Sequence, residues 1–160
     1  MRSRFLKKLK ILFVEDEQKI ASLIKEAIGG YFYKFLIAKD GAEALEIYYK
    51  FAPDIVIADI NMPILNGLDM AKEIRKDNKE IPIIILSAFS EKEKLFQAID
   101  VGVSKYFLKP YDPDALLDYI EQLTPMLEEK TIVLCDDFIF NKTTNTLYKN
   151  YKYIALSKNE

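Results

Sequence analysis

Two hydrophobic periods alternate along the first 126 residues. Short runs of consecutive apolar positions alternate with longer segments in which apolar residues recur every three or four positions. The first pattern is typical of strands buried on both faces, and the second is typical of helices with one buried face. The chain therefore predicts five strands, at 10–14, 34–38, 54–58, 81–86 and 106–108, each followed by a helix, at 17–28, 42–51, 68–76, 91–101 and 112–123.

This alternation is the sequence pattern of an α/β fold. Strands that alternate with helices form a parallel sheet with helices on both faces. We predict a doubly wound five-stranded parallel sheet with five helices over residues 9–126.

The last 30 residues have a different pattern. Four short β-rich stretches are separated by polar segments of hairpin length, which predicts a small antiparallel sheet that buries little apolar surface alone. We expect four parts: a basic leader at 1–8, the α/β domain at 9–126, a linker at 127–130 and the antiparallel β segment at 131–160.

Composition removes several kinds of chemistry. The 160 residues contain no histidine and one cysteine, Cys135. The absence of histidine excludes Ser-His-Asp and Cys-His nucleophiles and histidine-bound zinc or haem. A lone cysteine excludes intrachain disulfides and CxxC metal or redox motifs.

The charge is close to balanced, with 23 basic and 25 acidic residues, but the first ten residues carry five cations and no acid. The apolar run that follows ends at Glu15, well short of the roughly 7–15 apolar residues of a signal peptide. No run approaches the roughly 18 residues of a membrane helix. We therefore expect a solvated leader and a cytoplasmic protein that does not contact a membrane.

Polar residues end four of the predicted strands: Glu15 and Asp16, Asp59, Ser87 and Lys109. The carboxyl ends of parallel strands meet at one sheet edge, where ligands of open α/β folds bind. Any one of these residues alone would be an ordinary loop residue, but their joint occurrence at four strand ends indicates a site.

Three carboxylates at one edge repel one another. A single pair about 4 Å apart costs on the order of 4 kcal/mol at an effective dielectric near 20. Lys109 offsets one charge, so we expect a divalent cation to offset the rest. Oxygen ligands without histidine or cysteine favour a hard ion, Mg²⁺ or Mn²⁺.

Residues 9–126 resemble the receiver domain of bacterial two-component response regulators. The motifs that carry this resemblance are Ile-Leu-Phe-Val-Glu-Asp-Glu at 11–17, Pro-Asp-Ile-Val-Ile-Ala-Asp-Ile-Asn-Met-Pro at 53–63, Asn-Gly at 66–67, Leu-Ser-Ala at 86–88 and Tyr-Phe-Leu-Lys-Pro at 106–110. The resemblance implies a flavodoxin-like fold with strand order 2-1-3-4-5. It also implies a phosphoacceptor signalling protein that assists only its own phosphorylation and dephosphorylation, rather than an enzyme with a turned-over substrate.

The resemblance implies a role for each site residue. Asp59 would accept a phosphoryl group from a phosphohistidine of a sensor histidine kinase. Asp16, Asp59 and the backbone carbonyl of Asn61 would bind Mg²⁺, and Glu15 would hold the ion through water. Lys109 would pair with Asp59 and then with the phosphoryl oxygens.

Four further residues take implied or hypothetical roles. Ser87 would bind the phosphoryl group, and Tyr106 would move inward behind it as the second switch residue. The Lys109–Pro110 peptide bond would be cis. Phe89 stands where some family members carry an acid or amide that aids water attack, so we expect it to lengthen the phosphoryl lifetime.

Residues 131–160 resemble the opening β-platform of the winged-helix effector domain of the OmpR/PhoB class. The sequence stops at Glu160, before a helix-turn-helix and wing. We therefore expect transcription control, with DNA binding only where the rest of that domain is present.

In that class, the face formed here by the helix at 91–101, the strand at 106–108 and the helix at 112–123 switches on phosphorylation and forms a homodimer through acid–arginine pairs. This chain carries Lys105 where an acid is usual, and Asp118 and Glu121 where cations are expected. A charge-reversed dimer is one hypothesis, and phosphorylation-dependent crosslinks that survive Lys105→Glu would contradict it.

Three alternatives stay open. A stand-alone receiver would act by protein contact, with residues 131–160 as a docking sheet. An aspartate-nucleophile phosphohydrolase of the haloacid dehalogenase type has a similar residue set, but its nucleophile lies on the first strand and is followed two positions later by a second aspartate, where this chain has Asn61. A flavodoxin-like cofactor protein would need a phosphate-binding loop after the first strand, where Glu15, Asp16 and Glu17 would repel phosphate.

Overall fold

The computed structural model describes residues 1–88, 92–135, 138–141, 146–149 and 152–154, with side chains described within 1–88 and 92–130. Its main feature is a five-stranded sheet in the order β2-β1-β3-β4-β5, with every neighbouring pair parallel. The strands are β1 Lys10–Val14, β2 Lys34–Ala38, β3 Ile55–Asp59, β4 Ile83–Ser87 and β5 Lys105–Leu108. The predicted flavodoxin-like doubly wound fold and its strand order are confirmed.

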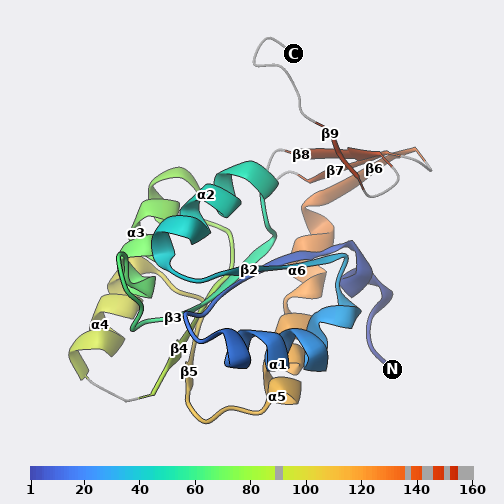
Figure 1. The fold of residues 1–160 in the computed structure, drawn as a ribbon. Helices are drawn as coiled ribbons and strands as arrows, with labels where there is room; N and C mark the ends of the chain where they lie inside the picture. The colour runs from blue at the N-terminus through green and yellow to red at the C-terminus, as the bar shows by residue number, and fades with distance from the viewer. Residues whose placement is uncertain (89–91, 136–137, 142–145, 150–151, 155–160) are drawn as a thin grey trace.

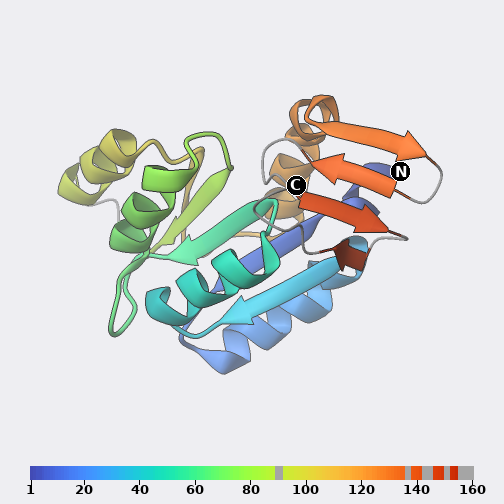
Figure 2. The same ribbon diagram turned by 90° about the horizontal axis from the view of Figure 1, so that it is seen from above.

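Helices cover both faces of this sheet (Figures 1 and 2). They are α1 Gln18–Ile28, α2 Gly41–Phe51, α3 Gly67–Asp77, α4 Lys92–Val101 and α5 Pro113–Gln122. In β1, Ile11 and Phe13 pack with α1 and α5, whereas Leu12 and Val14 pack with α2, α3 and α4. The strand is buried on both faces, which is why its sequence reads as a continuous apolar run.

The first residues of the chain are not a solvated leader. Residues Arg4–Lys8 form a short 3-10 helix, η1, and Phe5, Leu6 and Leu9 are buried in the core cluster on the α1–α5 side. Arg2 forms ion pairs with Asp118 and Glu121 of α5. The prediction of a solvated tail was wrong because the apolar residues between the cations turn inward together.

The segment after α5 is also more regular than expected. A further helix, α6, runs over Thr124–Glu129 and buries Leu127, so most of the predicted linker is helical. Pro125 lies in the first turn, where the missing N–H of proline costs no hydrogen bond. Lys130 pairs with Glu80 at 2.6 Å.

The predicted antiparallel β segment is confirmed in the backbone that is described. Strands β6 Thr131–Cys135, β7 Phe138–Asn141, β8 Thr146–Lys149 and β9 Lys152–Ile154 pair in sequence order, each antiparallel to the next. None of the described helices is both long enough and apolar enough to span a membrane.

Candidate functional site

The fold brings the predicted strand-end residues together at the carboxyl edge of the sheet. Glu15 and Asp16 follow β1, Asp59 and Ser87 are the last residues of β3 and β4, and Lys109 follows β5. One oxygen from each of Glu15, Asp16 and Asp59 lies within 4.8 Å of the others. The Lys109 ammonium is 3.0 Å from Oδ2 of Asp59 and 3.4 Å from Oε2 of Glu15.

Burial differs among the three acids. Glu15 and Asp59 are buried, at 1% and 8% exposure, whereas Asp16 is exposed. The pKa of Glu15 is raised, mainly by burial and also by the nearby charge of Asp59. The Glu17 amide N–H, which donates to Oε1 of Glu15 at 3.2 Å, and the Lys109 ammonium both act to lower this pKa. The site therefore has a shielded interior and an open side at Asp16.

Lys109 is held in the charged form. Burial alone would lower its pKa, but the hydrogen bond to Asp59 and the charges of Asp59 and Glu15 together outweigh burial, so the pKa is raised. One ammonium thus balances one of three carboxylates.

The Asn66–Gly67 turn fixes the backbone beside Asp59. The side chain of Asn66 caps α3 by accepting from the Asp69 N–H at 2.8 Å, and the Gly67 N–H donates to the Ile60 carbonyl at 3.0 Å. A Cβ on Gly67 would stand 2.2 Å from the Asp59 carbonyl oxygen. Glycine is therefore needed for α3 to begin directly against the end of β3.

The other predicted residues border this cluster. Ser87 is 1% exposed, and its carbonyl accepts from the Lys109 N–H at 2.7 Å. Tyr106 is half-buried against the core cluster that includes residues of α3 and α4. Asn61 is exposed in the loop after β3. The Lys109–Pro110 peptide bond is cis, as expected, and Phe89 lies outside the described residues.

Two residues near the site were not predicted from the sequence. Lys94 of α4 donates to Oδ1 of Asn61 at 2.9 Å and adds a second cation at this edge. Tyr111 buries its hydroxyl near the carboxylates. The one sequence signal for Tyr111 was its position two residues after Lys109. No sequence signal indicated Lys94, because its place beside Asn61 depends on where α4 packs.

The donor set fits a hard divalent cation. All three candidate ligand side chains offer carboxylate oxygens, close enough together for one ion to bind all of them. Lys109, which contacts two of these carboxylates, balances one negative charge. The acidic cluster therefore offers the oxygen donors that Mg²⁺ or Mn²⁺ prefers.

Comparison with known proteins places this geometry in a family. The sequence model described as the response regulator receiver domain matches residues 11–121. The chain belongs to this family. Receiver domains are signalling phosphoacceptors of two-component systems, bind Mg²⁺ at an acidic pocket and interact with histidine kinases.

Individual relatives match different lengths of this chain. A probable transcriptional regulator, ycf27, of Guillardia theta is 37% identical over 109 residues, which is 68% of this chain and 42% of the relative. The response regulator ArlR of Staphylococcus saprophyticus is 30% identical over 94% of this chain and 68% of the relative.

A solved structure shares the fold over nearly the same length. The Thermotoga maritima regulator DrrB, described as an OmpR/PhoB homologue, matches with a TM-score of 0.67 and 22% identity, over 94% of this chain and 67% of DrrB. At 94% coverage of this chain, both long matches extend past the receiver domain into the residues that follow it. The chain spans about half the length of several curated relatives that it matches.

Proposed function

We propose that this protein is a response regulator that accepts a phosphoryl group on Asp59 from a phosphohistidine of a sensor histidine kinase, and that phosphorylation controls transcription through an OmpR/PhoB-type effector domain. The observation that carries the proposal is the contact of Asp59 with Lys109 inside a cluster of three carboxylates. The proposed setting is the cytoplasm.

Each site residue then has a defined task. An oxygen of Asp59 attacks the phosphorus, the P–N bond of the donor breaks, and its electron pair returns to the imidazole. Lys109, charged and 3.0 Å from Asp59, donates to the incoming phosphoryl oxygens. Asp16, Asp59 and the carbonyl of Asn61 would hold Mg²⁺, with Glu15 binding through water. When bound, Mg²⁺ neutralises charge that develops on the phosphoryl group.

Ser87 and Tyr106 form the proposed switch. Ser87 ends β4, beside Asp59 at the end of β3, and we propose that its hydroxyl binds a phosphoryl oxygen. Tyr106 lies on β5 opposite Ile85 of β4 and is half-buried, and we propose that its ring moves inward when Ser87 binds the phosphoryl group. Phe89 is proposed to slow loss of the phosphoryl group.

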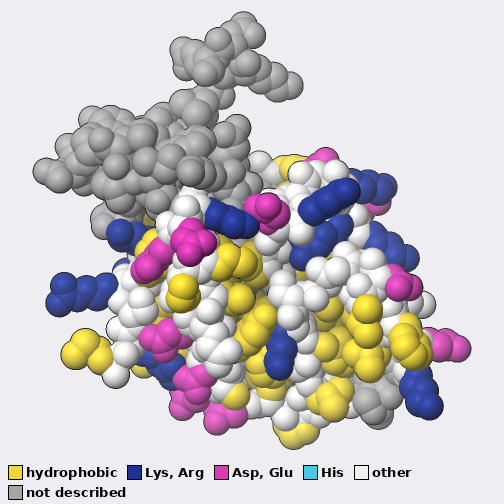
Figure 3. All heavy atoms as spheres, turned by 180° about the vertical axis from the view of Figure 1, so that it is seen from behind, with side chains coloured by type: hydrophobic (Ala, Val, Ile, Leu, Met, Phe, Trp, Pro, Cys, Tyr) yellow, Lys and Arg dark blue, Asp and Glu magenta, His cyan; other side chains and the backbone are white. Residues whose placement is uncertain are grey.

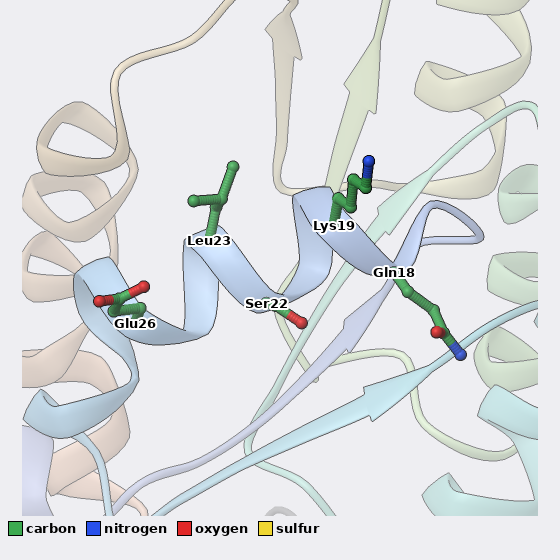
Figure 4. Close-up of a pocket in the computed structure, with 5 residues that line it drawn as sticks. All are labelled: Gln18, Lys19, Ser22, Leu23 and Glu26. Atoms are coloured by element: carbon green, nitrogen blue, oxygen red, sulfur yellow. The ribbon is translucent and has the colours of Figure 1, made fainter.

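A donor protein would approach along α1. This helix begins two residues after Asp16, and Lys19, Leu23 and Glu26 project from its successive turns around a shallow pocket (Figure 4). Leu23 is 63% exposed. An exposed leucine between charged residues, on the helix that follows Asp16, is suited to docking a kinase.

The proposed output surface is formed by α4, β5 and α5. Apolar side chains gather over α4 on the face shown in Figure 3, and the exposed ones on α4 and β5 are Leu95, Phe96, Ile99 and Leu108. A homodimer through this surface would compete with Arg2 of the same chain, which already binds Asp118 and Glu121. If residues 131–160 instead serve as a docking sheet, the output is protein contact rather than DNA binding.

Intact-mass measurement with a small acyl-phosphate donor tests the proposal. Wild type should gain one phosphoryl group with Mg²⁺ and far less without it, and Asp59→Ala should gain none. Asp100→Ala, which removes an exposed acid from α4, is the matched control and should be labelled like wild type. An unlabelled wild type, or a labelled Asp59→Ala variant, would contradict the assignment. Catalytic turnover of phosphoesters would favour the phosphohydrolase instead.

A further inference from the structure

A buried hydroxyl beside the acidic cluster has no partner in the protein. Tyr111 lies in the loop between β5 and α5, with its ring packed against the core cluster on the α1–α5 side. Among the side chains that the structure describes, its hydroxyl oxygen is the buried polar atom that makes no hydrogen bond. Phenylalanine would fill the same space without leaving a donor and an acceptor unsatisfied. Such a group calls for a water or ligand that completes it.

The surroundings of Tyr111 point to the cation site. Tyr111 follows Lys109 by two residues, and the Lys109 ammonium contacts both Glu15 and Asp59. Burial, and then the charges of Glu15 and Asp59, raise the pKa of the Tyr111 hydroxyl. The hydrogen bonds found for these carboxylates come from other donors. Glu15 accepts from the Glu17 N–H and Lys109, and Asp59 accepts from Lys109. Near this cluster, the Tyr111 hydroxyl is therefore the buried group that no described protein atom satisfies.

We propose that Tyr111 is a positioning residue of the cation site, linked to the carboxylates of Glu15 and Asp59 through a water molecule of the bound cation. Magnesium keeps several waters when proteins bind it, and the protons of those waters need acceptors. The phenolic oxygen would accept one of them, and its O–H would donate to another oxygen of the hydrated site. A bridging water is nearly as favourable as a direct hydrogen bond. This role rests on the proposed function, because it requires a cation at the acidic cluster.

Tyr111→Phe removes only the hydroxyl and is the decisive variant. Its melting temperature without Mg²⁺ should equal or exceed that of wild type, because an unsatisfied group is lost. Its Mg²⁺ affinity, measured by titration of backbone amide NMR signals, should fall about tenfold, or about 1.4 kcal/mol. In phosphoryl labelling, the Mg²⁺ concentration for half-maximal rate should rise by the same factor while the maximal rate is unchanged.

Tyr119→Phe is the matched control. Tyr119 is also half-buried, but its hydroxyl already donates to the Ser104 carbonyl at 3.1 Å, so this variant should bind Mg²⁺ like wild type. Equal affinity in Tyr111→Phe and wild type would overturn the role of Tyr111 while leaving phosphorylation of Asp59 intact. A tenfold loss with no labelling of Asp59 would support the role of Tyr111 and contradict the proposed function. A wild-type protein that does not bind Mg²⁺ would overturn both.

Discussion

At the residue scale, a second pair of buried charges lies at the edge of the sheet opposite the acidic cluster. Asp54 precedes β3 and accepts from the backbone N–H of Lys10 at 2.8 Å, and both residues are buried. The Lys10 ammonium donates to the Phe51 carbonyl. Burial raises the pKa of Asp54 to about 6 and lowers the pKa of Lys10 to about 8. The fold therefore disfavours the charged form of each side chain.

This predicts a specific pH dependence of stability. The folded protein binds a proton at Asp54 more tightly than the unfolded chain does, so stability from this group is full below about pH 4 and is lost as pH rises through 6. Relative to Asp54→Asn, wild type should gain about 2 kcal/mol in unfolding free energy between pH 7 and pH 4, at about 1.4 kcal/mol per pKa unit, because the unfolded carboxyl is still largely ionised at pH 4. Lys10 stays protonated over this range. Chemical denaturation of both proteins across it checks the prediction, and a pH-independent difference would contradict it.

The site residues differ in how far the sequence could predict them. Asp59 and Lys109 could be placed together because the carboxyl ends of the strands in a parallel sheet share one edge, regardless of the conformation of the loops. Tyr111 and Lys94 could not, because their positions depend on the loop after β5 and on the placement of α4. The buried charge pair at Asp54 was missed because a carboxylate before a strand is indistinguishable from a solvated one until the neighbouring strand is in place.

At the scale of elements, the N-terminal arm, residues 1–9, is part of the core. Leu6→Ala should destabilise the protein by about 2–5 kcal/mol, because Leu6 is 1% exposed and packs in the α1–α5 core cluster. Arg2→Ala should change stability little, since its ion pairs with α5 lie at the surface, are partly exposed to solvent and are screened by salt. Urea denaturation separates the two. A Leu6→Ala variant as stable as wild type would contradict burial of the arm and support a solvated leader.

Elements with strong periodicity were predicted well, and elements that depend on neighbours were not. The five strand–helix units follow from runs of apolar residues and from apolar residues spaced three or four positions apart. Neither pattern depends on tertiary contacts. The arm has too few residues for a recognisable period, and its four cations obscured the apolar residues Phe5 and Leu6. Residues 124–129 were read as a helix end and a linker because Pro125 can end a helix or begin one, and the sequence alone does not distinguish these roles.

At the scale of the whole molecule, the chain combines a receiver domain with a small antiparallel sheet. The alternation of periods predicted a parallel sheet, but the strand order was implied by the family resemblance, since periodicity does not determine which strands are neighbours. The order β2-β1-β3-β4-β5 places β1 beside β3 and so brings Glu15 and Asp16 next to Asp59. The phosphoacceptor proposal therefore depends on topology as much as on the acidic residues themselves.

The central claim is that Asp59 itself carries the phosphoryl group, and direct mapping of the modified residue tests it. Borohydride reduces the acyl phosphate of an aspartate to homoserine, which peptide mass spectrometry locates. After treatment with the phosphodonor and Mg²⁺, and then with borohydride, the account predicts homoserine at position 59 and unchanged aspartate at position 16. Homoserine at position 16, or at any other acidic position with Asp59 intact, would contradict it.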